Sequence, residues 1–428
     1  MQVLPSSSTI LRTISVSRLP LAVLAAMTFF TTAANSRTST NKIDTVLQVA
    51  VEEKKIPGIV AMVAVADRVT YQGAAGKRES ARNIPMTVDS IFRIASMVKP
   101  ITSVAVMQLV EKGRVKLDEP AATYLPELSR VQVLEEFDPE TGRVTLRPPR
   151  TPPTIRQLLS HTSGFAYESF DPGLHAYMAT VASSNTRPGD GLPPTTLLRF
   201  DPGARWEYGI STDWLGRLIE KISGHTLAEY FGEHIFHPLA MNDTFYDVPR
   251  DKQARVAVAF KHEPDGSFRE VASQPLQPVR VYSGGGGLYS TAGDYLKFER
   301  MLLRGGELGG ERILKSDTIE EMSRNQIGQL TVVPLPSLLP EIARDPVRLP
   351  GSLDKFGLGF AINTKPVEGG RSPGSLAWAG IYNTFFWIDP ARRTCAVLLM
   401  QTLPFADDLA NSVLEQFERA VYAGVRSN

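Results

Sequence analysis

FRIASMVKP, residues 92–100, opens an apolar run from Ile101 to Val110 that stops at Gly113. The run is long, contains no glycine, and ends at a glycine of the kind that follows helix C-termini, so it predicts a helix. Because the run is apolar nearly all round, the helix should be buried. Proline is tolerated in the first helical turn, and Pro100 therefore places the helix start near Ser96.

A serine and a lysine share one face at the start of this helix. Ser96 and Lys99 are three residues apart, so their side chains are neighbours. The backbone N–H of Ser96 is a free donor at the positive end of the helix dipole. An unpaired buried ammonium is costly, so a lysine here suggests a shifted pKa or a task. The pair offers a nucleophile, half an oxyanion hole and a neighbouring base, the Ser-x-x-Lys arrangement.

The same spacing occurs twice more, in a different context. One copy, Ser39 to Lys42, lies in a polar stretch near the N-terminus. The other, Ser352 to Lys355, lies among Pro, Gly and charged residues that predict a loop. Neither follows the pattern of a buried helix, so we assign the nucleophile to Ser96.

Composition excludes several classes of protein. The 428 residues are 43% hydrophobic, enough for one large core or two moderate ones. Charges are balanced, with 46 basic and 45 acidic residues, and no basic stripe suggests nucleic acid. Cys395 is the only cysteine, which excludes an intramolecular disulfide and a cysteine metal cluster. It lies in an apolar run and is expected to be a buried strand residue.

The N-terminus is typical of an exported protein. Residues 1–43 contain no Asp or Glu, and two arginines precede an apolar segment from Leu19 to Phe30. Small residues follow through Ala34, so we expect a signal peptide over residues 1–34 and a periplasmic or secreted protein. A disordered leader or an organellar transit peptide is the alternative. No other stretch could cross a bilayer, so no stable membrane span is expected in the mature protein.

The remaining pattern predicts an α+β fold. Strand-like runs gather at both ends of the chain, and helical patterns and loops fill the middle. We expect an antiparallel sheet flanked by helices, built from residues 41–110 and 278–428. Residues 111–277 should form a mainly helical insertion. The helix that begins near Ser96 lies where the first strands lead into the insertion, a natural place for a cleft.

Acyl transfer at a Ser/Lys site also needs a proton relay and a second oxyanion donor. Tyr208, just before a helical pattern, is a candidate for the relay, although a packed core tyrosine is the plain alternative. Trp378-Ala379-Gly380-Ile381 lies inside a run from Leu376 to Ile388 that predicts one strand. A glycine there leaves room for a ligand to approach the backbone.

Five motifs in this order resemble the serine β-lactamase and penicillin-binding protein superfamily. The nearest likeness is to the class C β-lactamase-like esterases, the family VIII carboxylesterases, and it covers roughly residues 44–423. Any one of the motifs is weak, but five in register are specific. They are Ser96-x-x-Lys99, Leu159-Ser-His-Thr-Ser-Gly164, Pro202-Gly-x-x-Trp206-x-Tyr208, Ser283-Gly-Gly-Gly-Gly287 and Trp378-Ala-Gly380.

The resemblance implies a role for each matching residue. Ser96 would be the acylated nucleophile, Lys99 its activating amine with a lowered pKa, and Tyr208 the general base and proton shuttle. The backbone N–H groups of Ser96 and Ile381 would form the oxyanion hole. No metal or organic cofactor is implied, and the partner is a small-molecule ester. The pocket would be lined by Trp378, Ala379, Gly380 and Ile210.

Two departures from the β-lactamase pattern affect the expected substrate. Trp378 stands where those enzymes carry the lysine of Lys-Thr-Gly, which would hold a substrate carboxylate. Ile210 stands where Tyr-x-Asn would supply an amide. A charge-assisted hydrogen bond contributes roughly 1.5–3 kcal/mol, so anionic β-lactams should bind about ten- to a hundredfold more weakly. Neutral esters with short acyl chains are favoured, with a weak cephalosporin-hydrolysing side activity.

Other patterns and functions were weighed against this hypothesis. Gly370-Arg-Ser372-Pro-Gly374 matches a Gly-x-Ser-x-Gly elbow but lies in a loop followed by a strand. His234 and His237 have helical spacing without a third metal ligand. The glycines at 284–287 lack the ending of a phosphate loop and suggest tight packing near the site. A class C-type β-lactamase, a DD-peptidase or acyltransferase, and an idle binding homologue remain as alternatives.

Overall fold

The computed structural model describes residues 42–424 except 54, 67, 184–195, 272–275, 277 and 348–349. The expected signal peptide, residues 1–34, lies outside the described residues. Within these described ranges, no helix is both long and apolar enough to span a bilayer.

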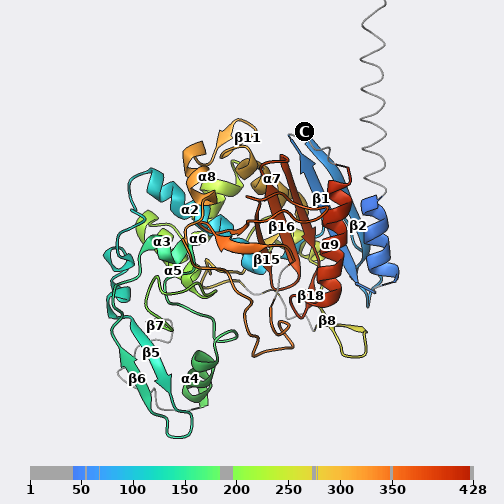
Figure 1. The fold of residues 1–428 in the computed structure, drawn as a ribbon. Coiled ribbons are helices and arrows are strands. Elements are labelled where there is room, and N and C mark those ends of the chain that lie inside the picture. Colours follow the sequence, from blue (N-terminus) through green and yellow to red (C-terminus); the bar gives the residue numbers. More distant parts are fainter. Residues whose placement is uncertain are drawn as a thin grey trace, which may run out of the picture.

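An eight-stranded antiparallel sheet joins the two ends of the chain, as the blue and red arrows in Figure 1 show. β1 pairs with β17 on one side, with Val60 opposite Leu399, and with β2 on the other. In spatial order the strands are β13 (Leu353–Phe356), β14 (Ala361–Asn363), β15 (Leu376–Gly380), β16 (Thr384–Asp389), β17 (Thr394–Leu399), β1 (Gly58–Val65), β2 (Arg68–Glu79) and β3 (Ile84–Pro85).

Both faces of the sheet are covered, which explains why β1 is apolar at nearly every position. Alternate side chains of a strand point to opposite faces. Ile59, Ala61 and Val63 pack toward a helix over residues 42–52 and α9 (Asp408–Tyr422). Their neighbours in sequence pack into the larger core on the other face, where α7 (Ala292–Leu303) lies against β17 and β1.

Shorter elements complete the fold, and α2 to α6 with β5 to β7 lie on the side of the sheet opposite α9 (Figure 1). The helices are α2 (Val98–Glu111), α3 (Ile155–Leu159), α4 (Pro172–Ser183), α5 (Ser211–Ser223), α6 (Leu227–Phe231) and α8 (Ser316–Ser323), with single turns at Ala95–Met97, Ala121–Thr123, Pro126–Arg130, Gly232–Phe236 and Arg250–Arg255. The small sheets are β4 (Phe92–Arg93) with β10 (Tyr289–Ser290), β11 (Glu307–Leu308) with β12 (Glu311–Arg312), β5 (Gln132–Phe137) with β6 (Val144–Arg147) and β7 (Leu197–Leu198), and β8 (Phe260–His262) with β9 (Phe268–Glu270) and β18 (Thr402–Leu403).

Threonine side chains cap the starts of two helices. Thr154 caps α3 in a capping box, and the Thr291 side chain accepts a hydrogen bond from the Asp294 N–H at the start of α7. Ser211, in contrast, does not cap α5. Its hydroxyl is hydrogen-bonded to the buried Ser163 hydroxyl at 2.8 Å, and not to a backbone N–H of its own helix.

The run from Leu376 to Ile388, predicted as one strand, is two strands joined by a tight turn over residues 381–383. Asn383 makes the turn: its φ is +57°, a conformation that asparagine tolerates. Its side-chain amide donates to the carbonyls of Thr402 and Pro404, both at 2.9 Å. Ile381 therefore lies at the end of β15 and not inside a strand.

Candidate active site

Three side chains from two distant segments meet at the floor of one cavity. The Tyr208 hydroxyl donates a hydrogen bond to Ser96 Oγ at 2.7 Å, and Lys99 Nζ donates to the same oxygen at 3.2 Å. Lys99 Nζ also donates to the Gly285 carbonyl at 2.7 Å. Ser96 thus faces a phenol and an amine, the two groups that an acyl-transfer nucleophile needs nearby.

The turn that carries Ser96 is fixed by its neighbours. Ser96 lies in the helical turn Ala95–Met97, just before α2, and Ala95 has a φ of +43°. The Tyr295 hydroxyl donates to the Met97 carbonyl at 2.9 Å. A Cβ on Gly380 would overlap the Ile94 carbonyl oxygen. The space at Gly380 is therefore filled by the chain that leads to Ser96, and not by a ligand.

Lys99 is buried, yet it is held as an ammonium. Burial by itself would lower the pKa of Lys99, but the phenols of Tyr167 and Tyr208 and the carboxylate of Asp213 together raise it above the usual value. The lowered pKa that Lys99 would need to act as an activating amine is therefore not found, because the charge and hydrogen-bond partners outweigh burial. An ammonium cannot take the proton of Ser96. It stabilises negative charge on nearby oxygens, and it lies 4.8 Å from the centre of the Tyr208 ring.

His161 forms the wall behind Tyr208. The two ring centres are 5.1 Å apart, and the imidazole stacks on Trp378 at 6.5 Å. Burial, with a smaller effect from Lys99, lowers the pKa of His161 to about 3, so the ring is neutral at physiological pH. His161 packs as part of an aromatic wall that fixes the orientation of the Tyr208 ring.

Ser96 opens into a cavity of about 480 Å³, within the size range of small-molecule sites. Trp378, Ala379 and Ile381 line it, whereas Gly380 and Ile210 are not among its lining residues. Ile210 packs against the main core instead. The other lining residues are Tyr167, Ser169, Phe170, Trp206, Tyr208, Val332, Val333, Pro334, Leu335, Val347, Gly351, Ser352, Leu353, Asp354, Ala361 and Phe405. Most are aromatic or aliphatic, and none of these lining residues is a lysine or arginine.

Comparison with known proteins agrees with this geometry. The beta-lactamase family model matches residues 43–417. The chain belongs to the beta-lactamase family. The expected β-lactamase-like α+β fold and the resemblance to the serine β-lactamase and penicillin-binding superfamily are thereby confirmed.

Relatives in this family include hydrolases and acyltransferases. The chain is 31% identical over 410 residues to a monacolin J acid methylbutanoyltransferase from Aspergillus terreus, which covers 89% of this chain and 95% of that protein. It is 30% identical over 398 residues to a lovastatin esterase from Penicillium rubens, and the match covers 89% of this chain and 98% of that protein. The structure of unliganded simvastatin synthase from Aspergillus terreus matches this one with a TM-score of 0.78 at 30% identity. The match covers 90% of this chain and 98% of that chain.

The other serines with suggestive spacing are not arranged as nucleophiles. Ser39 lies outside the described residues. Ser352 lines the cavity, but Lys355 Nζ donates to two backbone carbonyls at 2.8 and 2.6 Å. Ser372 lies in a loop before β15, and its N–H donates to Asp389 at 2.9 Å. A strand follows Ser372 where a nucleophile elbow requires a helix.

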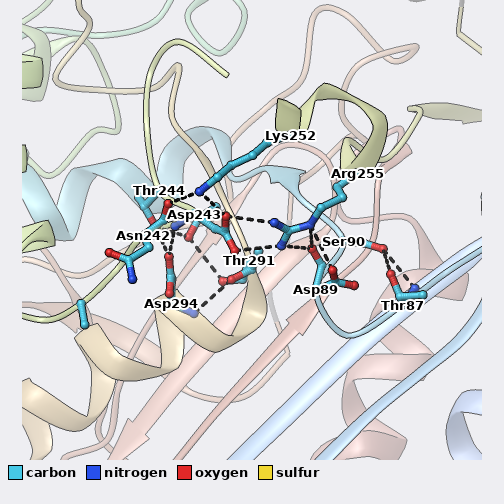
Figure 2. Close-up of polar contacts among 12 residues, drawn as sticks. Thr87, Asp89, Ser90, Asn242, Asp243, Thr244, Lys252, Arg255, Thr291 and Asp294 are labelled. Carbon is cyan, nitrogen blue, oxygen red and sulfur yellow. Dashed lines mark hydrogen bonds and ion pairs between the residues drawn. The ribbon is translucent and has the colours of Figure 1, made fainter. Parts of the chain in front are cut away.

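In the part of the chain that the structure describes, no group of three or more His, Cys, Asp or Glu residues could hold a metal ion. Figure 2 shows a cluster of carboxylates that instead bind cationic side chains. Asp243 pairs with Lys252 and Arg255, each at 2.8 Å. This network fastens the segment around Asp243 to the start of α7, where Asp294 accepts the Asp243 N–H at 2.6 Å. The ring of His234 packs on Tyr230 at 4.4 Å.

Sequence analysis missed two residues beside Lys99. The ring of Tyr167 lies 5.3 Å from Lys99 Nζ, and burial raises the pKa of its phenol. Asp213, in the first turn of α5, adds a carboxylate on the other side. Tyr167 follows the motif that ends at Gly164 and Asp213 follows Tyr208 by five residues. Neither spacing indicates that the side chain faces Lys99, because that depends on how the segments pack.

Proposed function

We propose that this protein is a serine carboxylesterase of the family VIII type, which hydrolyses short-chain acyl esters through an acyl-enzyme on Ser96. The observation that carries the proposal is the contact of Ser96 Oγ with Tyr208 and Lys99 at the floor of an apolar cavity. A hydroxyl with a phenol at 2.7 Å and an ammonium beside it is suited to nucleophilic attack on a carbonyl.

In the first half of the reaction, Tyr208 acts as the general base. The Tyr208 hydroxyl first releases its proton to solvent. The reacting state then pairs the Tyr208 phenolate with the Lys99 ammonium, and the Ser96 hydroxyl donates along the same short contact. The Ser96 oxygen attacks the ester carbonyl as its proton passes to Tyr208. The backbone N–H groups of Ser96 and Ile381 receive the oxyanion, since both residues line the cavity. Tyr208 then returns the proton to the leaving alcohol.

In the second half, water replaces the alcohol. Tyr208 takes a proton from the water as the hydroxide oxygen bonds to the acyl carbon. The tetrahedral intermediate collapses, the Ser96–acyl bond breaks, and Tyr208 returns the proton to Ser96. General acid–base help of this kind contributes roughly 10²–10⁴-fold to the rate.

The cavity favours a neutral ester with a bulky apolar alcohol part. A volume of about 480 Å³ is far more than an acetyl or butyryl group needs, so the remainder takes the alcohol. None of the described residues that line the cavity is cationic, so a substrate carboxylate would lose hydration without a partner among them. This argues against DD-peptidase and class C β-lactamase activity and leaves cephalosporin hydrolysis as a weak side reaction. The names of two relatives, a methylbutanoyltransferase and a lovastatin esterase, support acyl-ester chemistry, and the first names a short acyl group.

Acyl transfer to an alcohol is the second candidate. The apolar wall that contains Phe170 and Trp206 suits an alcohol acceptor better than it suits water. Replacing water by an alcohol in the second half-reaction gives transesterification with the same residues.

The test is a panel of p-nitrophenyl esters of increasing acyl length, run beside nitrocefin and beside an added apolar alcohol. We expect turnover of the acetate and butyrate, abolished in Ser96→Ala and retained in Ser372→Ala. Loss of activity in Ser372→Ala with retention in Ser96→Ala would overturn the assignment. Faster ester consumption with formation of a new ester on adding the alcohol would favour the transferase. Preferential turnover of D-Ala-D-Ala peptides would favour the peptidase.

A further inference from the structure

The turn over residues 283–285 lies between the nucleophile helix and α5. On one side, Lys99 Nζ donates to the Gly285 carbonyl at 2.7 Å and the Thr102 hydroxyl donates to the Gly284 carbonyl at 2.7 Å. On the other side, a Cβ on Gly284 would overlap the Thr212 carbonyl oxygen. The turn therefore sets the distance between α2 and α5, and its glycines are required by this close approach.

Asp213 is the residue that fixes the turn from the α5 side. Its Oδ1 accepts hydrogen bonds from the Ser283 hydroxyl and from the Gly285 N–H, the latter at 3.2 Å. The peptide unit on each side of Gly285 is thus engaged: the N–H donates to Asp213 and also to Ser283 Oγ at 3.1 Å, and the carbonyl accepts from Lys99. A Cβ on Gly285 would lie 2.7 Å from Asp213 Oδ2, so this contact also requires glycine.

The charge of Asp213 also acts on Lys99 directly. Its carboxylate is one of three groups that keep Lys99 protonated, together with the phenols of Tyr167 and Tyr208. The remaining titratable group beside them, His161, is neutral. Asp213 therefore acts on Lys99 in two ways, through the Gly285 peptide and through its own carboxylate.

We propose that Asp213 is a positioning residue for the reaction at Ser96. Its carboxylate holds the Gly285 carbonyl in place, and that carbonyl holds the Lys99 ammonium within reach of Ser96 Oγ. The plain alternative is that Asp213 only stabilises the N-terminus of α5, as an acidic residue in a first helical turn commonly does. The proposal rests on the proposed function, because it assigns Asp213 to the nucleophilic chemistry of Ser96.

The experiment measures the reactivity of Ser96 in the full chain carrying Asp213→Asn. The variant keeps the size of the side chain and removes its charge. A fluorophosphonate that bonds to the serine oxygen gives two quantities, the rate of labelling and the fraction of protein labelled at completion. Ser96→Ala, which lacks the reacting oxygen, measures the background labelling. Ser283→Ala is the control for the loss of neutral hydrogen bonds, because it removes the hydroxyl that donates to Asp213 and accepts from the Gly285 N–H, and it leaves the Asp213 carboxylate and its own contact with that N–H in place.

For Asp213→Asn, we expect labelling to slow roughly ten- to a hundredfold, the range for loss of a charge-assisted hydrogen bond. The kcat for p-nitrophenyl butyrate should fall in parallel while KM changes by less than about threefold, since the lost contact acts on the reacting groups. Ser283→Ala should lower the rate of labelling by less than about fivefold. The fraction labelled at completion should match the wild type in both variants.

Three results would overturn the proposal. One is a labelling rate in Asp213→Asn within about twofold of the wild type. Another is a loss that appears wholly as a smaller labelled fraction with an unchanged rate, which is the signature of a purely structural role. The third is a wild-type Ser96 that the fluorophosphonate does not label. A wild type that is labelled but hydrolyses no ester would refute the esterase and leave the role of Asp213 testable by the labelling rate alone.

Discussion

Replacing Tyr208 by phenylalanine removes a single oxygen atom and keeps the ring in its aromatic surroundings. The lost group is the phenol that lies 2.7 Å from Ser96 Oγ. If it relays the proton, kcat/KM for p-nitrophenyl butyrate should fall roughly 10²–10⁴-fold. At 1.36 kcal/mol for each factor of ten, that is about 2.7–5.5 kcal/mol of transition-state stabilisation.

A loss of stability cannot produce an effect of that size. One hydrogen bond contributes about 0.5–1.5 kcal/mol to folding, whereas a domain is stable by about 5–15 kcal/mol. The ring of Tyr208 retains its contacts with His161 and Trp378, at 5.1 Å each. Nearly all of the Tyr208→Phe protein should therefore be folded, and the loss should appear in the rate per folded molecule.

Tyr422→Phe is the matched control, because it makes the same chemical change at another buried hydrogen bond. The Tyr422 hydroxyl donates to Asp389 at 2.9 Å, and neither residue lines the cavity. We expect a lower urea midpoint with an unchanged kcat/KM. The assay is steady-state hydrolysis of p-nitrophenyl butyrate with folding checked by urea titration. A Tyr208→Phe protein with kcat/KM within about threefold of the wild type would refute the relay.

Three further substitutions test other parts of the structure. Gly380→Ala places a methyl group against the Ile94 carbonyl, so we expect a loss of about 1–3 kcal/mol in urea titration and slower turnover; an unchanged rate would show that the turn before Ser96 tolerates the shift. Burial raises the pKa of Glu299 well above its usual 4.5. The stability linked to protonated Glu299 is therefore fully present below pH 4.5 and is lost as the pH rises toward the pKa of Glu299 in the folded protein. Glu299→Met should therefore flatten the decline of the urea midpoint between about pH 5 and 8, and an equally steep decline would contradict this. Arg371→Met leaves the carboxylate of Glu418 buried without its partner at 2.6 Å, which should cost about 3–5 kcal/mol of stability with the rate per folded molecule unchanged; a cost below about 1 kcal/mol would mean that the pair is solvated.

Local signals in the sequence predicted the elements that carry the nucleophile. The buried helix after Ser96, with Pro100 in its first turn, depends on a few neighbouring residues, and the structure has it as expected. The strands at both ends of the chain could also be predicted, because β1 and β17 are apolar on both faces. These features are short-range, so a single sequence contains the information.

The features that were missed depend on contacts between distant segments. The raised pKa of Lys99 could not be predicted, because burial was visible in the sequence and the approach of Tyr167, Tyr208 and Asp213 was not. Gly380 was attributed to a ligand, since the approach of the Ile94 carbonyl cannot be inferred from residues 376–388. The turn at Asn383 did have a local signal, because asparagine tolerates a positive φ, but an unbroken apolar run outweighed it.

The position of β1 in the large sheet affects how the protein is made. β1 is buried on both faces and has β17 on one edge and β2 on the other. During synthesis β1 leaves the ribosome with the whole helical region still to be translated, and its β17 edge has no partner until the chain is almost complete. A nascent chain with a long, apolar, unpaired edge is prone to aggregate. Pairing across nearly the full length of the chain also makes folding slow. Production of active protein should therefore respond strongly to growth temperature and to the supply of chaperones.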